Sequence, residues 1–81
     1  MKIDVGKLHT TELGAERIRR NLSLETDDVV AWCKRAILDA DDAAVLRKGK
    51  NWYVQCPACV ITVNANSGTL ITAHRLKGDE V

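Results

Sequence analysis

Apolar side chains recur every three or four positions in the first half of the chain, and this spacing predicts two helices. The first spans about residues 10–22, where Thr10 and Thr11 are candidate N-caps. The second spans about residues 26–39, with Thr26 as its candidate N-cap. Their apolar stripes contain Ala15, Ile18 and Leu22 in the first helix, and Val29, Cys33 and Ile37 in the second.

After the second helix the apolar period changes from helical to two, which predicts strands. Four segments fit, at about residues 43–47, 51–56, 59–64 and 69–76. Short connections between consecutive strands predict an antiparallel meander. Two helices can cover only one face of such a sheet. The sequence therefore predicts an α+β fold over residues 1–81, a single domain with two N-terminal helices packed on one face of a four-stranded antiparallel β-meander.

Alternation along the strands assigns side chains to the two faces. Trp52 is expected to be buried under the helices and Tyr53 to lie on the uncovered face, because adjacent strand residues point to opposite sides. The expected covered set is Trp52, Val54, Cys56, Cys59, Ile61, Val63, Ile71 and Ala73. The expected uncovered set is Asn51, Tyr53, Gln55, Thr62, Asn64, Thr72 and His74, with Val60, Leu70 and Leu76 among them. Such a polar face can bind a ligand, although Thr and Tyr are also ordinary strand formers.

Charge is distributed unevenly along the chain. The chain has 12 Lys and Arg and 11 Asp and Glu, so its charges nearly balance. This balance excludes a function that rests only on a polybasic arm or an acidic tail. Residues 43–78 contain no acid, whereas residues 23–42 are rich in acids. A basic sheet with hydroxyl and aromatic side chains fits a phosphate-bearing ligand such as RNA. The alternative is a charge dipole that keeps the protein soluble or guides a protein partner.

The expected compartment is the cytoplasm. The N-terminal residues lack the continuous apolar stretch of an export signal. Apolar runs such as residues 59–61 are far too short for a membrane-spanning helix, so we expect no membrane association. Three cysteines, an odd count, argue against a disulfide framework in a reducing compartment.

Three segments carry a family resemblance: KLHTTELGAERI at residues 7–18, KGKNWYV at 48–54 and ITVNANSGTLITAH at 61–74. They resemble a family of small uncharacterised bacterial proteins catalogued as domain of unknown function 3781. This family name implies no activity. At the level of fold, the chain also resembles RelE-like and barnase-like RNases, which place one or two helices before a four-stranded antiparallel sheet. That second resemblance implies metal-independent RNA cleavage on the open face.

Metal-independent RNA cleavage needs a base, an acid and cations that stabilise the phosphorane. The candidate catalytic residues are His74, His9 and Tyr53. The candidate nucleic-acid-binding residues are Lys50, Arg17, Arg75, Asn64 and Thr72. The leading hypothesis is a small cytosolic RNA-binding protein, and one form of this hypothesis is a metal-independent RelE-like RNase. The alternative is a non-catalytic protein-binding module, such as an inhibitor or accessory factor of a mobile element, and a homodimer is also open.

The motif Cys56-Pro57-Ala58-Cys59 is predicted to be a turn between two strands. Its spacing is also that of half a zinc knuckle. A complete site would need Cys33 and a histidine, and Cys33 belongs to the apolar stripe of a helix. We therefore interpret the motif as two small apolar residues that flank a turn, and expect no metal and no cofactor. A zinc-stabilised domain is the third and least favoured alternative.

Overall fold

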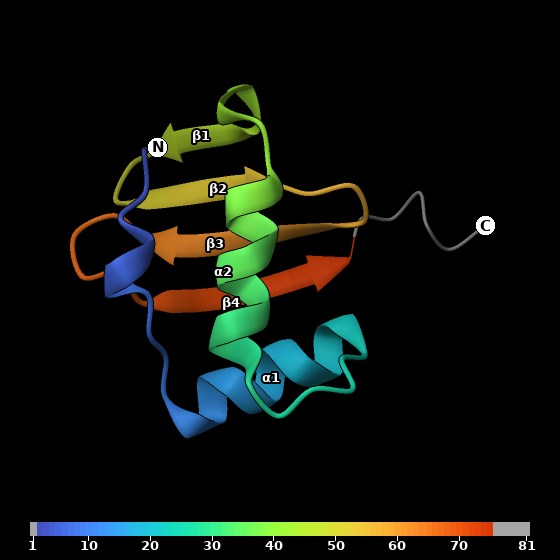
Figure 1. The fold of residues 1–81 in the computed structure, drawn as a ribbon. Helices are drawn as coiled ribbons and strands as arrows, with labels where there is room; N and C mark the ends of the chain where they lie inside the picture. Colours follow the sequence, from blue (N-terminus) through green and yellow to red (C-terminus); the bar gives the residue numbers. More distant parts are fainter. Residues whose placement is uncertain (1, 76–81) are drawn as a thin grey trace.

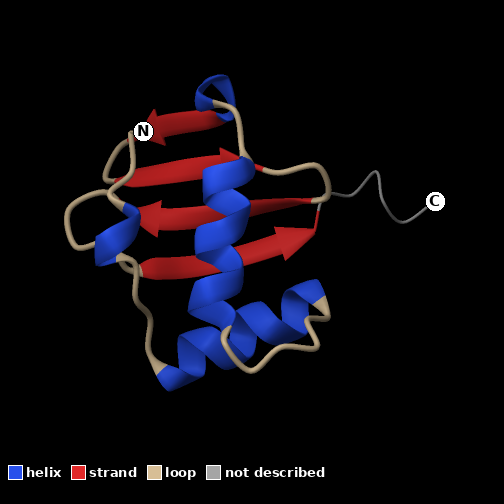
Figure 2. Ribbon diagram, viewed as in Figure 1, coloured by secondary structure: helices blue, strands red, loops and turns tan. Residues whose placement is uncertain are grey.

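The computed structural model describes residues 2–75 and has the predicted α+β architecture (Figure 1). Its elements are η1 (Val5–Lys7), α1 (Glu12–Leu22), α2 (Val29–Asp39), η2 (Asp42–Ala44), β1 (Val45–Lys48), β2 (Asn51–Gln55), β3 (Cys59–Asn64) and β4 (Leu70–Arg75). The strands form one antiparallel sheet in the order β1-β2-β3-β4. In Figure 2, α2 runs across the strands while α1 lies beside β4.

The start of α1 depends on two threonines. Thr11 is the N-cap, as predicted, and its hydroxyl accepts a 3.0 Å hydrogen bond from the Gly14 amide. The Thr10 hydroxyl donates a 3.0 Å hydrogen bond to the carbonyl oxygen of Leu70 in β4. A Cβ at position 14 would overlap this Thr10 hydroxyl, so the glycine lets α1 begin against the sheet.

The prediction that Thr26 caps the second helix is wrong. The N-cap is Asp28, whose carboxylate accepts a 3.0 Å hydrogen bond from the Ala31 amide. The Thr26 hydroxyl instead accepts a 3.1 Å hydrogen bond from the Asp28 amide, so it orders the turn before α2. Both residue types cap helices well, and the carboxylate also stabilises the positive end of the helix dipole.

The strand boundaries differ from the predicted ones by one or two residues. β1 begins at Val45 because residues 42–44 form a 3-10 turn. β2 ends at Gln55, where the chain enters the turn that contains Pro57. The last strand begins at Leu70, and the predicted Leu76 lies outside the described residues.

The register of β4 contains a bulge. Val63 pairs with Leu70 and Thr62 pairs with Thr72, so Ile71 is an extra residue in the ladder. Leu70 is therefore buried under the helices at 1% exposure, whereas Ile71 is 38% exposed. The predicted faces of these two residues are wrong because a bulge shifts the alternation by one position.

Trp52 is half-buried rather than buried as predicted. It packs against the core, and the Arg47 guanidinium lies 5.2 Å from the centre of its ring. Trp52 borders a small pocket together with Lys2 and Ile3 of the N-terminal segment. The segment before α1, rather than α2, thus reaches this end of the covered face.

The core fills the space between the helices and the sheet. The two helices contribute fully buried Ile18, Cys33 and Ile37, and Ile61 of β3 and Val54 of β2 are also fully buried. The remaining buried apolar residues are Ile3, Leu8, Leu22, Val29, Val45, Cys56, Cys59, Val63, Leu70 and Ala73. One face of the sheet is thereby sealed by the helices.

Candidate nucleic-acid interface

The face of the sheet opposite the helices carries a row of side chains that crosses all four strands. Leu46 pairs with Tyr53, Tyr53 with Thr62, and Thr62 with Thr72. Tyr53 is half-buried and Leu46 is 48% exposed. The same register places further side chains on this face, among them Lys48, Asn51, Gln55, Val60 and His74.

A shallow depression of about 460 Å³ lies on this face, lined by Leu46, Lys48, Tyr53, Gln55 and Val60, with Gly49 at its end. The lining combines an aromatic ring, aliphatic side chains, an amide and an ammonium group. An aromatic ring with a neighbouring cation is a common platform for an unpaired nucleotide base and its phosphate.

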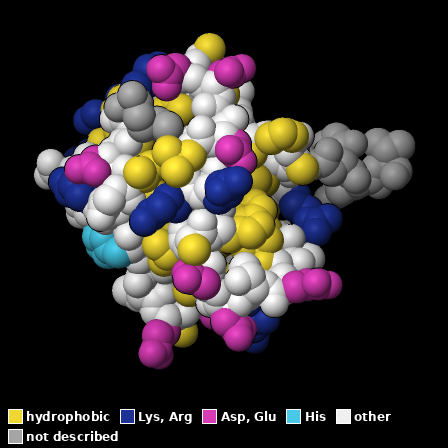
Figure 3. Space-filling model, viewed as in Figure 1, with side chains coloured by type: hydrophobic (Ala, Val, Ile, Leu, Met, Phe, Trp, Pro, Cys, Tyr) yellow, Lys and Arg dark blue, Asp and Glu magenta, His cyan; other side chains and the backbone are white. Residues whose placement is uncertain are grey.

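Every described residue from 43 to 75 lacks a carboxylate side chain. The helix-covered side differs, because acidic and basic side chains lie next to one another there (Figure 3). On α1, Glu16 forms ion pairs with Arg19 at 2.8 Å and with Arg20 at 3.0 Å. The hydrogen bonds from these two guanidinium groups lower the pKa of Glu16. An anionic ligand thus meets no carboxylate on the sheet itself.

Lys50 and Asn64 come together at the end of the sheet where the β1–β2 and β3–β4 turns lie. They border a polar groove of about 690 Å³ with Arg47, Asn66 and Ser67. The Asn64 side-chain oxygen accepts hydrogen bonds from the backbone amides of Asn66 and Ser67, both at 2.9 Å. Asn64 therefore orders the β3–β4 turn. Of the two predicted nucleic-acid-binding residues at this groove, Lys50 is the one that carries a positive charge.

Arg75 and Arg17 lie away from that groove. Arg75 pairs with Cys59 at the beginning of β3, whereas Lys50 lies near the end of β3, about 16 Å along the strand at ~3.3 Å per residue. The Arg75 guanidinium donates a 3.3 Å hydrogen bond to the carbonyl oxygen of Leu22 at the end of α1. Arg17 is exposed on α1. The structure does not bring the three predicted cations to one place.

The predicted proton-transfer residues are also separated. His9 is bridged to Thr69, next to the beginning of β4, and its two ring nitrogens contact the Lys7 carbonyl oxygen at 2.9 Å and the Thr69 hydroxyl at 3.1 Å. His74 lies five residues beyond Thr69, about 16 Å away along the strand. Tyr53 is on β2, with β3 between it and His74.

Lys48 and Leu46 are the residues of this face that the sequence analysis did not single out. Both lie on the short edge strand β1, whose face assignment needs its pairing with β2. The available signal was the two-residue turn Gly49-Lys50, since a hairpin of this length pairs Lys48 directly with Asn51. That pairing puts Lys48 and Leu46 on the same face as Tyr53.

The cysteine motif is a turn between β2 and β3, as predicted. Cys33, Cys56 and Cys59 are buried, and none of the three is in a disulfide. Burial raises the pKa of Cys33 and of Cys56 to about 12, so both stay protonated at neutral pH. Within residues 2–75, no three His, Cys, Asp or Glu side chains cluster as metal ligands would.

None of the helices within residues 2–75 has the length and apolar character needed to cross a membrane. These features define a class: a small α+β protein whose two helices cover one face of a four-stranded meander. The chain belongs to the family described as a protein of unknown function, DUF3781, whose model matches residues 3–74. The family resemblance drawn from the sequence is thereby confirmed. Neither the curated proteins nor the solved structures gave a match.

Proposed function

We propose that the protein binds single-stranded RNA on the uncovered face of the sheet. The observation that carries this proposal is the row Leu46, Tyr53 and Thr72 on a sheet without carboxylates, in which Thr62, paired between Tyr53 and Thr72, is buried at 5% exposure and only supports its neighbours. Unpaired bases stack on an aromatic side chain, and hydroxyls reach their polar edges. A flat, half-apolar face with cations at one end suits such a strand better than it suits a duplex.

Phosphate contacts would come from Lys48 on the face and Lys50 in the adjoining turn. Both are exposed, and they flank Gly49. Each phosphate that a lysine neutralises releases counterions, so these contacts supply affinity that weakens with salt. The ring of Tyr53, next to Lys48 in the same depression, would hold a base.

The positions of the histidines support binding rather than cleavage. General acid–base cleavage needs two groups that reach the same phosphodiester. His9 is engaged with Lys7 and Thr69, about 16 Å along the strand from His74. We therefore propose RNA binding as the activity, and RelE-like cleavage would require a residue other than these two to complete the pair.

The experiment is a binding titration of a short labelled single-stranded RNA, in dilute buffer and again at physiological salt. Replacing Lys48 or Lys50 by Ala is expected to weaken binding to all sequences and to lower the salt slope by about one. Tyr53→Ala is expected to cost ~1–3 kcal/mol of binding free energy, while Tyr53→Phe keeps the stacking ring. Lys34→Ala, on α2, is the matched control and is expected to leave affinity unchanged.

Absence of binding by the wild-type protein in dilute buffer would contradict the proposal. An equal loss in Lys34→Ala would show that binding follows total charge rather than this face. Incubation of the same RNA with wild-type protein and with His74→Ala tests cleavage separately. Turnover that depends on His74 would show that the protein is an enzyme.

A protein partner is the second candidate for the same face. The exposed side chain of Leu46 favours it, because apolar side chains on an uncovered sheet are common at protein interfaces. Binding of that kind would be lost in Leu46→Asp and would change little with salt. The two lysine variants would leave it nearly unchanged, which separates it from RNA binding.

A further inference from the structure

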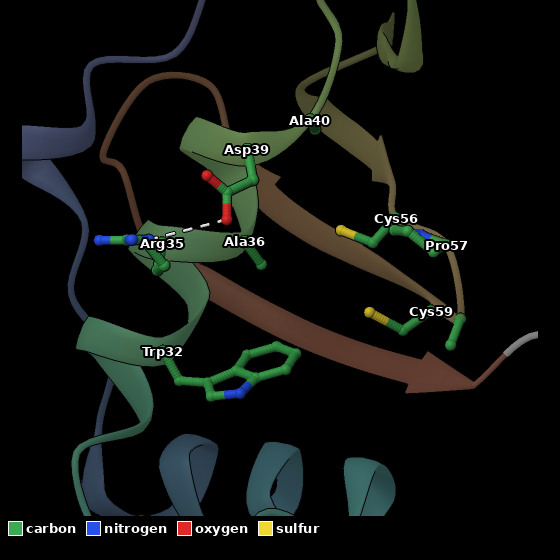
Figure 4. A pocket seen from close by; sticks show the side chains of 9 residues that line it. Trp32, Arg35, Ala36, Asp39, Ala40, Cys56, Pro57 and Cys59 are labelled. Carbon is green, nitrogen blue, oxygen red and sulfur yellow. Dashed lines mark ion pairs between the residues drawn. The ribbon is translucent and has the colours of Figure 1, made fainter.

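A pocket of about 410 Å³ opens between α2 and the turn that joins β2 to β3 (Figure 4). Its walls are mostly apolar and include Trp32 and Ala36 from α2, and Ala40, which follows the helix as its C-cap. Arg35 and Asp39 also line it and form an ion pair with a separation of 3.7 Å. The pocket is on the helix-covered side of the sheet, so it is independent of the RNA-binding face.

Two thiols point into this pocket from the turn. Figure 4 shows the sulfur atoms of Cys56 and Cys59 directed toward α2. The Cys56 amide donates a 2.8 Å hydrogen bond to the Cys59 carbonyl oxygen, which holds the two ends of the turn together. The Cys56 thiol donates a 3.9 Å hydrogen bond to the carbonyl oxygen of Val54. Both cysteines are buried, and their remaining exposure of 9% and 5% is at the pocket wall.

The number of ligands selects the class of ion. Within the described part of the chain, no third His, Cys, Asp or Glu completes a group around one ion. Zinc in proteins takes four ligands, so this pair alone does not make a zinc site. Thiolates select soft ions, among which Cu(I) is satisfied by two sulfur ligands in a linear arrangement.

We propose that Cys56 and Cys59 together bind one Cu(I) ion, which enters through the pocket beside Trp32. Two S–H bonds break, two S–Cu bonds form, and two protons pass to water, with no change in the oxidation state of copper or sulfur. The resulting bis-thiolate complex carries one negative charge.

The two tryptophans allow a site-specific test. Trp32 lines the pocket, whereas Trp52 packs beneath Arg47 at another part of the fold. The protein is titrated anaerobically with Cu(I) in the presence of a competing chromogenic chelator, and tryptophan fluorescence is recorded. We expect one ion per chain and quenching that persists in Trp52→Phe but disappears in Trp32→Phe.

Cysteine variants assign the ligands. Cys56→Ser and Cys59→Ser are each expected to lower Cu(I) affinity at least 100-fold, while Cys33→Ser leaves it unchanged. Circular dichroism checks that each variant folds, and the two tryptophan variants keep all thiols, so they test the site even where a serine variant does not fold. No binding in competition with the chelator, equal loss in Cys33→Ser, or quenching through Trp52 would each overturn the proposal. Zinc binding with two chains per ion would overturn it as well, since four cysteines from a dimer would then form the site.

Discussion

The side-chain amide of Asn21, near the end of α1, donates a 3.0 Å hydrogen bond to the backbone carbonyl oxygen of Ala73 in β4. Ala73 lies on the outermost strand of the sheet, where carbonyl groups have no further strand to pair with. The Thr10 hydroxyl acts in the same way at the Leu70 carbonyl oxygen, also at 3.0 Å. Two side chains of the α1 region thus cover an edge that would otherwise be open to pairing with another chain.

Replacing Asn21 by Ala is expected to lower the free energy of unfolding by about 1 kcal/mol, because the Ala73 carbonyl loses its donor. Asn21→Asp is expected to cost more, since a carboxylate cannot donate and repels the carbonyl oxygen. Urea unfolding measures both. Arg17→Ala, an exposed change on the same helix, is the control and is expected to stay within about 0.5 kcal/mol of wild type. Equal stabilities of the Ala and Asp variants would argue against the hydrogen bond.

Gly68 and Gly49 make a matched pair, because both have positive φ, of 77° and 62°. A Cβ at Gly68 would lie 2.7 Å from the Lys7 carbonyl oxygen, whereas one at Gly49 would meet nothing within 4 Å. We expect Gly49→Ala to cost ~1 kcal/mol from backbone conformation alone, and Gly68→Ala to cost ~3 kcal/mol because the N-terminal segment must move as well. Thermal unfolding of the two variants gives the comparison. Similar losses of stability in the two variants would show that the N-terminal segment moves away from the new methyl group without a cost in free energy of unfolding.

Trp52→Ala is expected to cost about 2 kcal/mol, less than the ~3–5 kcal/mol typical of a fully buried aromatic residue. The reason is that Trp52 is half-buried at one end of the sheet. Arg47→Ala is expected to remove about 0.5–1 kcal/mol of cation–π stabilisation. A double-mutant cycle of the two changes measures the coupling. Additive losses would show that the 5.2 Å contact between Arg47 and the ring contributes nothing.

Alkaline pH is expected to destabilise the fold through the buried thiols. Burial raises the pKa of Cys33 from 9.0 to about 12, so the unfolded chain loses this proton at lower pH than the folded chain does. The stabilisation is therefore complete below about pH 9 and is lost as pH rises toward 12, by ~1.4 kcal/mol per pH unit for each such thiol. Urea midpoints measured across this range are expected to fall less steeply in Cys33→Ala. Parallel slopes in the two proteins would contradict this account.

The pattern of the sequence was sufficient for the class of fold and for the element order. Periods of 3.6 and two separate the helical half from the strand half, and the cap at Thr11 and the turns at Gly49 and Pro57 are local features. Local features set local structure, so these predictions are confirmed. The cap of α2 shows their limit, since Thr26 and Asp28 are both good caps and packing of α2 on the sheet selects between registers that differ by two residues.

The site depended more on tertiary structure. The bulge at Ile71 puts Leu70 in the core and leaves Ile71 exposed, and no alternating pattern can reveal it because it exists only in the pairing with β3. The candidate residues were chosen by type, and only the fold shows that His9 and His74 lie near opposite ends of β4 while Lys48 joins Tyr53 on one surface. Residue type and period are properties of a segment, so the sequence by itself determined the helices, the strands and the turns between them. Which distant side chains meet depends on strand pairing and helix packing over the whole chain, and only the tertiary structure decided it.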